Sequence, residues 1–342
     1  MLTYIIVGSG YRAEYFGRIA RTWPELFNAC YLCRSEEKAS LMRKNTGAEA
    51  VLTAEEALAF KPDFIVVAVD RGHVADVAEA WIEHGLPVVT ETPVGDTEEK
   101  LLRLEALARR GARIVCCEQY HRYPILAAGL EAIRQGAIGA PQSAYISLAH
   151  DYHAASLLRR ALMIGRESYE LHGLRRTSFA VNTDSRYEAI LDGSVTEEVR
   201  DRVLIDFESG KTAIYDFAPL QYRSYIRSRH FTVRGDQGEW SDTTVYRLDG
   251  QEAPCRMALM PEIPDRYRRL DTQYLRDLRK TWRSELFLDT LQDEYAIATI
   301  LLDMEDYLRG GPSPYPLWEA IEDARFWLKL DRLVCHIPSG DR

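Results

Sequence analysis

The sequence predicts an α/β fold: a doubly wound parallel sheet at the N-terminus, followed by an α+β domain with a large open, mainly antiparallel sheet. Over residues 1–118 of the 342-residue chain, short strands alternate with amphipathic helices, which implies a parallel sheet covered on both faces. The strands YIIVG and FIVVAV are continuously apolar, as burial on both faces requires. After Tyr123 several strands follow one another without intervening helices.

In the first domain, residues 1–118, each expected strand leads into an expected helix. The strands are expected at Leu2–Val7, Ala29–Cys33, Ala50–Leu52, Phe64–Val69, Pro87–Thr90 and Ala112–Cys116. The amphipathic helices between them are expected at Ala13–Thr22, Glu36–Asn45, Ala54–Ala59, Val74–His84 and Thr97–Arg110. Because parallel neighbours need a long crossover connection, this order is typical of repeated βαβ units.

The second domain, residues 119–342, changes pattern from alternation to consecutive strands. It is expected to begin with the helix Pro124–Gln135, the strand Ser143–His150 and the helix Ala154–Met163. Further strands, separated by turns such as ESGK and GDQGEW, are expected at Arg175–Asn182, Arg202–Glu208, Lys211–Phe217, Arg229–Arg234 and Thr244–Leu248. Long helices return at Asp271–Arg283, Leu286–Leu308 and Leu317–Leu333.

The bulk composition argues against several classes of partner. A hydrophobic content of 46% with 28% charged residues is typical of a globular protein with a substantial core. The formal charge of −9 and the pI near 5.5 argue against a nucleic-acid or anionic-membrane partner. No apolar run approaches the roughly 20 residues that span a bilayer, and MLTYIIVGSGYR lacks the basic region of a signal peptide. We therefore expect a cytoplasmic protein that acts on a small molecule.

The six cysteines predict neither a metal site nor a redox pair. Cys30 and Cys33 lie in the strand-like NACYLC, where an odd offset places two side chains on opposite faces. Cys116 and Cys117 are adjacent and diverge for the same reason. Buried free thiols are the better interpretation.

A glycine-rich turn lies directly between the first strand and the first helix. Gly8 permits a tight turn, Gly10 lets the backbone approach a pyrophosphate, and Ala13 is small enough for close helix–strand packing. The free N–H groups at the helix start would face the anion. This context predicts a dinucleotide site in a Rossmann domain, with cofactor contacts from Gly8, Ser9, Gly10, Tyr11, Arg12 and Ala13. A plain β–α turn is the alternative.

The end of the second strand usually distinguishes NAD from NADP. An acid there binds the ribose hydroxyls of NAD, whereas a basic or hydroxyl-bearing residue suits a 2′-phosphate. This chain has Cys33-Arg34-Ser35 and no acid before Glu36. Arg34 with Ser35 therefore favours NADP over NAD, although a solvated arginine at a strand end is the alternative.

The chain resembles the Gfo/Idh/MocA oxidoreductases, which include glucose–fructose oxidoreductase and inositol dehydrogenase. The resemblance covers nearly the whole chain and rests on segments in order: GSGYRA, CRSEEKA, VAVDRGHVADVAEAWIEHGLPVVTETPVG, GAIGAPQSAYISLAH, SRHFTVRGDQGEW and YPLWEAIEDARFWLKL. It implies nicotinamide bound at a cleft, hydride transfer to or from a sugar or polyol carbon, and a second domain whose open sheet often serves oligomerisation. A homodimer or homotetramer through that sheet is therefore expected.

The resemblance also implies particular cofactor contacts. Val69, Asp70 and His73 occupy the loop that lines the cofactor, and Gln119 opens the segment that joins the two domains. Glu91-Thr92-Pro93 matches the family's Glu-Lys-Pro, so Glu91 and Pro93 are expected at the cofactor.

Two departures from the family pattern concern proton transfer. Thr92 stands where the family has a lysine that orients the substrate, and a hydroxyl supplies a hydrogen bond but no charge. The family also has an Asp and a His four residues apart, which correspond here to Ala149 and His153. The catalytic candidates are therefore Thr92, His153 and, from the joining segment, His121.

Other roles for the residues around His153 were weighed. His150 and His153 with a remote acid would make a metal site, but no metal is predicted, and Asp151 is equally suited to capping the following helix. Arg159, Arg160, Arg166, Arg175 and Arg176 would bind an anionic substrate group or be solvated. One strand parity, shared by Tyr225, Arg227, Arg229 and Phe231, would face a partner subunit.

Two functions fit these patterns. The first is an NAD(P)-dependent oxidoreductase acting on a carbohydrate-like or other hydroxylated or carbonyl-bearing small molecule, with a non-standard proton-transfer apparatus. The second is a catalytically inactive NAD(P)-binding sensor or partner-binding subunit on the same scaffold. The departures at Thr92 and Ala149 support the second, and the intact glycine turn supports nucleotide binding in both.

Overall fold

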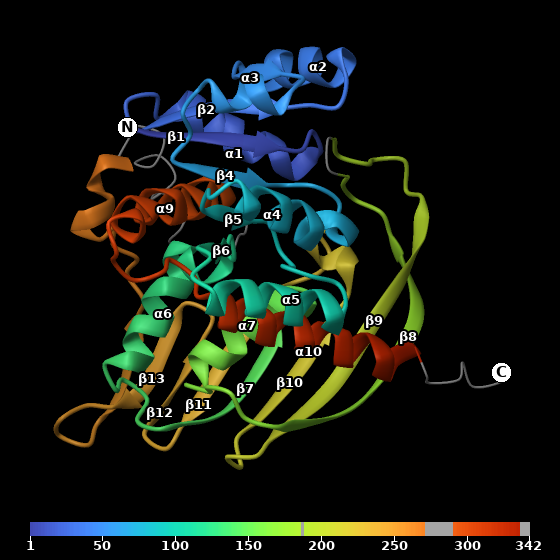
Figure 1. The fold of residues 1–342 in the computed structure, drawn as a ribbon. Helices are drawn as coiled ribbons and strands as arrows, with labels where there is room; N and C mark the ends of the chain where they lie inside the picture. Colours follow the sequence, from blue (N-terminus) through green and yellow to red (C-terminus); the bar gives the residue numbers. More distant parts are fainter. Residues whose placement is uncertain (186–187, 271–289, 336–342) are drawn as a thin grey trace. The chain divides into compact units, whose positions relative to one another are not determined.

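The computed structural model describes residues 1–185, 188–270 and 290–335, and contacts within the chain divide them into two units (Figure 1). The first unit contains residues 1–123, 263–270 and 290–325, and the second contains residues 124–185, 188–262 and 326–335. The sequence places the boundary after residue 118 and assigns all that follows to the second domain. In the structure, part of the C-terminal region instead belongs to the first unit.

The first unit is built on a parallel sheet, as predicted. Its described strands run in the order β3-β2-β1-β4-β5-β6, and every neighbouring pair is parallel. The bounds are β1 Leu2–Val7, β2 Phe27–Leu32, β3 Glu49–Val51, β4 Phe64–Val67, β5 Val88–Thr90 and β6 Ile114–Cys116. The strand order reverses between β1 and β4, and ligands of doubly wound sheets bind in the crevice outside the carboxyl ends at such a switch point.

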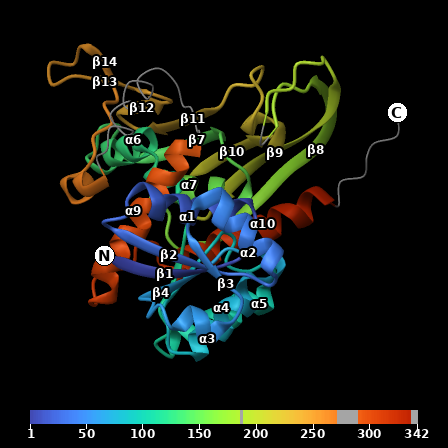
Figure 2. The same ribbon diagram turned by 90° about the horizontal axis from the view of Figure 1, so that it is seen from above.

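Helices cover both faces of this sheet. They are α1 Tyr11–Thr22, α2 Glu36–Thr46, α3 Ala54–Leu58, α4 Val74–Glu83 and α5 Glu98–Arg109, with the 3-10 turns η1 Arg71–His73 and η2 Tyr120–Arg122. Figure 2 shows α1 and α2 on one face and α4 and α5 on the other. Ile5, Val66 and Val88 lie between these layers with no exposed surface, which explains why the strands are apolar at every position.

A helix from the C-terminal region completes the first unit. This helix, α9 (Thr290–Leu308), packs against α1 and follows the described turn η4 (Asp265–Leu270) in the same unit. Arg18 Nε donates to Glu294 Oε1 at 2.6 Å, and Trp23 Nε1 donates to the Leu270 carbonyl at 3.3 Å. Helix α10, Leu317–Cys335, ends the described chain.

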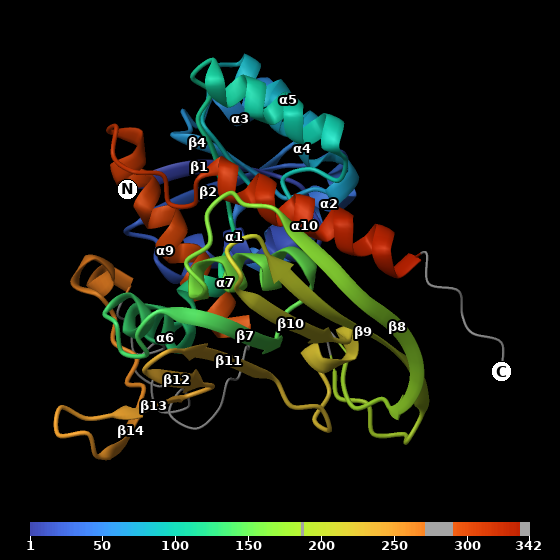
Figure 3. The ribbon, with the colours of Figure 1, turned by 90° about the horizontal axis from the view of Figure 1, so that it is seen from below.

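The second unit carries the large sheet that the sequence predicts (Figure 3). Its described strands run in the order β14-β13-β12-β11-β7-β10-β9-β8 and are antiparallel except for the pair β7 and β10. The bounds are β7 Pro141–Ser147, β8 Tyr169–Val181, β9 Val195–Phe207, β10 Thr212–Phe217, β11 His230–Gly235, β12 Gly238–Ser241, β13 Thr244–Leu248 and β14 Pro254–Ala258. Helices α6 Pro124–Arg134 and α7 Asp151–Ala161 and the turn η3 Pro219–Tyr222 belong to this unit.

Several sequence predictions need correction in the second unit. Strands β12 and β14 were not predicted, because they have only four and five residues. The predicted shared face of Tyr225, Arg227, Arg229 and Phe231 is wrong: β11 begins at His230, and Phe231 is fully buried. The predicted helix Asp271–Arg283 lies outside the described residues.

Four of the cysteines are buried, as the sequence predicts. Cys30, Cys33, Cys116 and Cys117 are buried free thiols, and burial raises the pKa of the Cys116 and Cys117 thiols well above the ordinary value. Among the described residues, no helix is long and apolar enough to cross a membrane.

Candidate active site

The glycine-rich turn lies at the switch point of the parallel sheet. Gly8 follows β1 with φ of +139°, and a Cβ there would lie 2.1 Å from the Ala68 carbonyl oxygen after β4. Only glycine therefore allows β1 and β4 to approach this closely. A Cβ on Gly10, in contrast, would meet nothing within 4 Å, so the space beside Gly10 is open.

The start of α1 differs from that of neighbouring helices. Ser35, Thr53 and Thr97 each accept a hydrogen bond from a first-turn N–H and so cap α2, α3 and α5. Gly10 precedes α1 and supplies no side-chain cap. The first-turn N–H groups of α1 thus have no capping side chain, which is the arrangement that suits a phosphate.

Arg12, in the first turn of α1, reaches the end of β5. Its Nε donates to Glu91 Oε2 at 3.2 Å and its Nη2 to Glu91 Oε1 at 3.1 Å, while Nη1 donates to Asp293 Oδ2 of α9 at 3.4 Å. The guanidinium also lies 4.6 Å from the centre of the Tyr15 ring. Burial raises the pKa of Glu91, and Asp293 adds to this, while Arg12 opposes it.

Asp293 accepts hydrogen bonds from two further side chains. Gln119 Nε2 donates to Asp293 Oδ1 at 2.9 Å, and the Tyr123 hydroxyl donates to the same oxygen. Gln119 is only 2% exposed, and its Oε1 has no hydrogen-bond partner among the described residues. Thr90 Oγ1, at the end of β5, is also buried and has none there. These atoms together with the open space at Gly10 fit a polar ligand such as a dinucleotide.

Thr92 follows Glu91 in the loop after β5. Its backbone N–H donates to the Glu91 carboxylate, its side chain is half-buried, and the peptide bond to Pro93 is cis. The Thr92 hydroxyl has no partner within the described part of the chain. It is therefore free to bond to a ligand.

The loop after β4 contains Val69, Asp70 and His73. Asp70 Oδ1 accepts from the Gly72 N–H at 3.0 Å, and Lys100 of α5 donates to the Gly72 carbonyl and, at 2.8 Å, to Asp96 Oδ1. His73 is exposed at the end of η1. The Lys100 side chain of α5 thus fixes the position of this loop.

Arg34 lies at the end of β2, as the sequence predicts. It is exposed and forms no hydrogen bond or ion pair with another described residue. Ser35 beside it accepts the Lys38 N–H at 3.3 Å and caps α2. No carboxylate of the described residues pairs with Arg34, so its charge is available to a ligand.

His121 is buried in η2. Its Nε2 accepts a hydrogen bond from Arg122 Nε at 2.9 Å, and its ring lies 5.3 Å from that of Tyr315. The catalytic role of His121 stays a prediction from the sequence.

The second unit has a cluster of titratable groups where β7 leads into α7. The backbone N–H of His150 donates to the Tyr222 hydroxyl at 2.8 Å, and that hydroxyl also bonds to His150 Nδ1. Asp151 has φ of +39°, its backbone N–H donates to the Tyr215 hydroxyl at 3.2 Å, and this hydroxyl bonds to Asp151 Oδ1 at 3.3 Å. Two tyrosines thus position two ionisable groups.

The acidity of the Asp151 carboxyl differs from that of an ordinary aspartate. Burial raises its pKa to about 6, with Asp201 contributing in the same direction, while the Tyr215 hydrogen bond opposes this. Arg175 neutralises Asp201 through Nε and Nη2 at 2.7 and 2.9 Å. A carboxyl that titrates near neutral pH suits acid–base chemistry.

His153 lies in the first turn of α7 and is 5% exposed. Its ring lies 4.8 Å from that of His150 and 4.6 Å from that of Tyr152. The structure therefore brings His153 together with His150, Tyr152 and Asp151. Among the described residues, no group of three or more His, Cys, Asp or Glu side chains could hold a metal ion.

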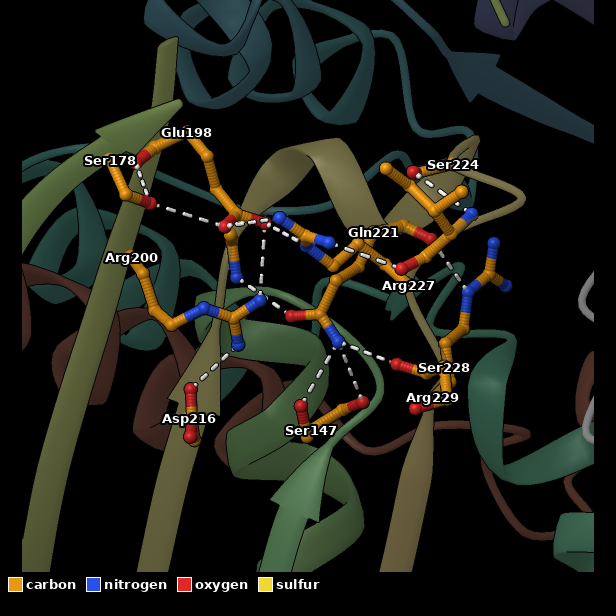
Figure 4. A network of polar contacts seen from close by, with 12 residues as sticks. Ser147, Ser178, Glu198, Arg200, Asp216, Gln221, Ser224, Arg227, Ser228 and Arg229 are labelled. Atoms are coloured by element: carbon orange, nitrogen blue, oxygen red, sulfur yellow. Dashed lines mark hydrogen bonds and ion pairs between the residues drawn. The ribbon is translucent and has the colours of Figure 1, made fainter. Parts of the chain in front are cut away.

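A polar network fixes the loop that carries Tyr222 (Figure 4). Arg227 donates to the Glu198 carboxylate of β9 through Nε and Nη2 at 2.8 and 3.2 Å. Arg200 donates to both Glu198 and Asp216. Gln221 Nε2 donates to Ser147 Oγ at 3.0 Å and to the Ser228 carbonyl at 2.9 Å. The residue before Tyr222 is thus tied to the end of β7, three residues before His150.

Sequence reasoning missed Asp293, Tyr215 and Tyr222. Asp293 lies 281 residues from Arg12, and Tyr215 and Tyr222 lie 64 and 72 residues from their partners. No periodicity or spacing signals such pairs, because each belongs to a different element.

Comparisons with known proteins support the nucleotide-binding fold. Residues 2–119 match the family model described as an oxidoreductase family with an NAD-binding Rossmann fold. A search of curated proteins finds no match.

Solved structures are similar over nearly the whole chain. One is an oxidoreductase from Agrobacterium radiobacter in complex with NAD+, L-tartaric acid and magnesium, with 13% identity, 100% and 97% of the two chains covered, and a TM-score of 0.67. Another, a proposed NADPH-dependent oxidoreductase from Desulfitobacterium hafniense, has 13% identity, 97% and 94% coverage, and a TM-score of 0.67. The UDP-N-acetylglucosamine 3-dehydrogenase of Acidithiobacillus ferrooxidans has 12% identity, 97% and 97% coverage, and a TM-score of 0.63.

At these identities the solved structures establish a shared fold, and the family model adds the NAD-binding signature of the first unit. Residues 2–119 therefore carry the NAD-binding Rossmann signature of the Gfo/Idh/MocA oxidoreductase family.

Proposed function

We propose that the chain is an NAD(P)-dependent oxidoreductase that moves a hydride between nicotinamide and a carbon of a hydroxylated or carbonyl-bearing small molecule. The observation that carries this proposal is the uncapped start of α1, with open space at Gly10, at the switch point of the sheet. The cofactor, when bound, supplies the hydride donor or acceptor. L-Tartaric acid and UDP-N-acetylglucosamine, named with two similar structures, are both hydroxylated molecules.

The chain's own residues would hold the two ends of the nucleotide. The N–H groups of the first turn of α1 bind the pyrophosphate, and Arg34 with Ser35 binds the ribose end. Val69, Asp70 and His73 line the cofactor from the loop after β4, and Glu91 and Pro93 from the loop after β5. Thr92 donates its hydroxyl hydrogen to the reacting oxygen of the substrate.

Proton transfer is assigned to the second unit. We assign it to Asp151 and His150, held by Tyr215 and Tyr222, with His153 packed behind them. The Tyr222 oxygen accepts the His150 backbone N–H and also bonds to His150 Nδ1. A hydroxyl in place of a cation at Thr92 suits a substrate whose reacting oxygen needs less charge stabilisation.

The experiment that tests this function is a titration of the purified chain with NADPH and NADH, followed by nicotinamide fluorescence. Binding of either nucleotide in the micromolar range supports the proposal, and absence of binding at millimolar concentration would overturn it. Turnover is then measured with a panel of hydroxy acids, polyols and sugars. Binding without turnover on any of them would favour the non-catalytic sensor instead.

Replacing Arg34 with alanine is expected to weaken NADPH binding by about 10- to 100-fold and NADH binding by less than about threefold. The reason is that a charge-assisted pair to the 2′-phosphate contributes about 1.5–3 kcal/mol, whereas NADH lacks that phosphate. Fluorescence titration of both nucleotides measures the ratio. Lys38→Ala, one turn further along α2, is the control; equal losses for NADPH and NADH in Arg34→Ala would contradict the NADP preference.

The open face of the large sheet is proposed as a homo-oligomer contact. Leu204 and Ile214 pair across β9 and β10, and they are 42% and 45% exposed on the face opposite the buried Val203 and Tyr215. Leu204→Glu is expected to lower the mass measured by analytical ultracentrifugation to that of a monomer. The same mass for wild type and variant would count against this contact.

A further inference from the structure

Gln119 has a defined amide orientation. Its partner Asp293 has only acceptor oxygens when ionised, so the atom 2.9 Å from Oδ1 must be the amide nitrogen. The amide oxygen, Oε1, therefore points away from Asp293 as an acceptor. It is buried and has no partner within the described residues. A buried acceptor without a donor costs about 1–3 kcal/mol, so a donor from outside the chain would stabilise it.

Arg12 binds the other oxygen of Asp293 and supplies hydrogen-bond donors, whereas Gln119 supplies an acceptor. A guanidinium has five N–H donors, and three of those of Arg12 are used by Glu91 and Asp293. The other two N–H groups have no acceptor among the described residues, and the side chain is 31% exposed. Since Arg12 and Gln119 bind the two oxygens of one carboxylate, a donor and an acceptor are held side by side.

We propose that Gln119 and Arg12, held by Asp293, form a recognition site for a primary carboxamide, the group carried by the nicotinamide end of NAD(P). A carboxamide presents one carbonyl acceptor and two N–H donors, which match the free N–H groups of Arg12 and the Oε1 of Gln119. Asp293 is the positioning residue, because it orients both side chains without touching the ligand. This inference rests on the proposed function.

The location within the first unit supports the assignment. Arg12 runs from the first turn of α1 to the residue after β5, so its guanidinium lies on the β4 and β5 side of the switch point. Arg34, assigned to the ribose phosphate of the adenosine end, lies after β2 on the other side. A dinucleotide whose pyrophosphate lies at α1 would therefore place its nicotinamide end on the side of Arg12.

The test compares two nucleotides that differ only in this group. In acetylpyridine adenine dinucleotide a methyl ketone replaces the carboxamide, which keeps the carbonyl and removes the N–H donors. Wild type is expected to bind NAD+ about tenfold more tightly than this analogue, because the analogue leaves Gln119 Oε1 unpaired. Gln119→Met, which fills the same space without an acceptor, is expected to bind the two nucleotides equally.

Asp293→Asn provides a second variant in case Gln119→Met fails to fold. An asparagine can accept from or donate to Gln119, so the amide loses its single orientation and the preference for NAD+ is expected to fall below about threefold. Arg34→Ala is the matched control and is expected to keep the preference, since it acts at the other end of the nucleotide. Calorimetry measures all affinities, and thermal melting checks that each variant is folded.

The outcomes separate this inference from the proposed function. If wild type binds neither nucleotide, the proposed function is overturned and the carboxamide site with it. If wild type binds both nucleotides equally, or if folded Gln119→Met keeps the wild-type preference, the carboxamide site is overturned while nucleotide binding stands. Loss of the preference in Gln119→Met and Asp293→Asn, with retention in Arg34→Ala, supports the site.

Discussion

Gly8→Ala is expected to lower the free energy of unfolding by about 4 kcal/mol, a large part of the 5–15 kcal/mol typical of a domain. Two costs combine. The backbone at φ of +139° lies in a region that residues with a Cβ rarely adopt, and the added Cβ would lie 2.1 Å from the Ala68 carbonyl oxygen. Since that oxygen belongs to the backbone following β4, the strands themselves would have to separate. Urea unfolding followed by circular dichroism measures the change.

Gly10→Ala is the matched control, because the same chemical change two residues away has a different consequence. Gly10 has φ of −92° and ψ of 177°, which alanine adopts readily, and its Cβ would meet nothing within 4 Å. Stability should therefore change by less than about 0.5 kcal/mol. The methyl group occupies the space proposed for the pyrophosphate, so nucleotide affinity is expected to fall by more than about tenfold. Unchanged affinity would contradict the proposed position of the nucleotide.

Compared with wild type, Asp151→Asn is expected to gain stability as the pH rises from acidic to neutral. Because the pKa of Asp151 is raised from 3.8 to about 6 in the folded chain, its protonated form is favoured by folding. The protonated Asp151 carboxyl therefore contributes to the free energy of unfolding, fully below pH 3.8, and this contribution is lost as the pH rises through about 6. It amounts to about 2–3 kcal/mol when the partial exposure of the group is allowed for. The asparagine does not titrate and still accepts from Tyr215.

The measurement is urea unfolding of wild type and Asp151→Asn at pH 4 and pH 7.5. The difference in unfolding free energy between the two proteins should shift by about 2–3 kcal/mol in favour of the variant at pH 7.5. Other carboxyl groups contribute equally to both proteins and cancel. Glu170→Gln, at an exposed carboxylate of β8, is the control and should show no comparable shift. If the Asp151→Asn difference were independent of pH, a carboxyl titrating near 6 would be excluded.

The same substitution addresses function once a substrate is known. A general acid or base contributes about 10²–10⁴-fold to the rate, so the turnover of Asp151→Asn should fall within that range while nucleotide affinity is kept. Ionising Asp151 lowers the stability of the folded chain, and Tyr215 holds its carboxyl in place. Active sites often carry such groups, because catalysis can require residues that reduce the free energy of unfolding.

Much of the first unit could be predicted from the sequence because its signals are local. Continuous apolar runs predicted the parallel strands, and the glycines between the first strand and the first helix predicted the tight turn there. The position of Arg34 at the end of β2 also follows from element order alone. Each of these depends on residues within one βαβ unit, where sequence distance and spatial distance agree.

The second unit was less predictable because some of its strands are short. Strands β12 and β14 have only four and five residues, too few for a clear alternation of apolar and polar side chains. The segment before β11 showed a strand-like parity, but Arg227 and Arg229 bond to Glu198 and to the η3 carbonyls instead. Side-chain hydrogen bonds to a neighbouring strand and to the loop itself override such a pattern.

The sequence by itself determined the two-domain α/β architecture, the glycine turn and the absence of a lysine beside Glu91. Only the tertiary structure decided which groups surround that turn and which carboxyl titrates near neutral pH. Asp293 reaches Arg12 and Gln119 because α9 folds back onto α1, and Asp151 meets Tyr215 because β10 lies beside β7. The physical reason is that burial and hydrogen bonding depend on neighbours in space, and those neighbours come from elements up to 281 residues apart.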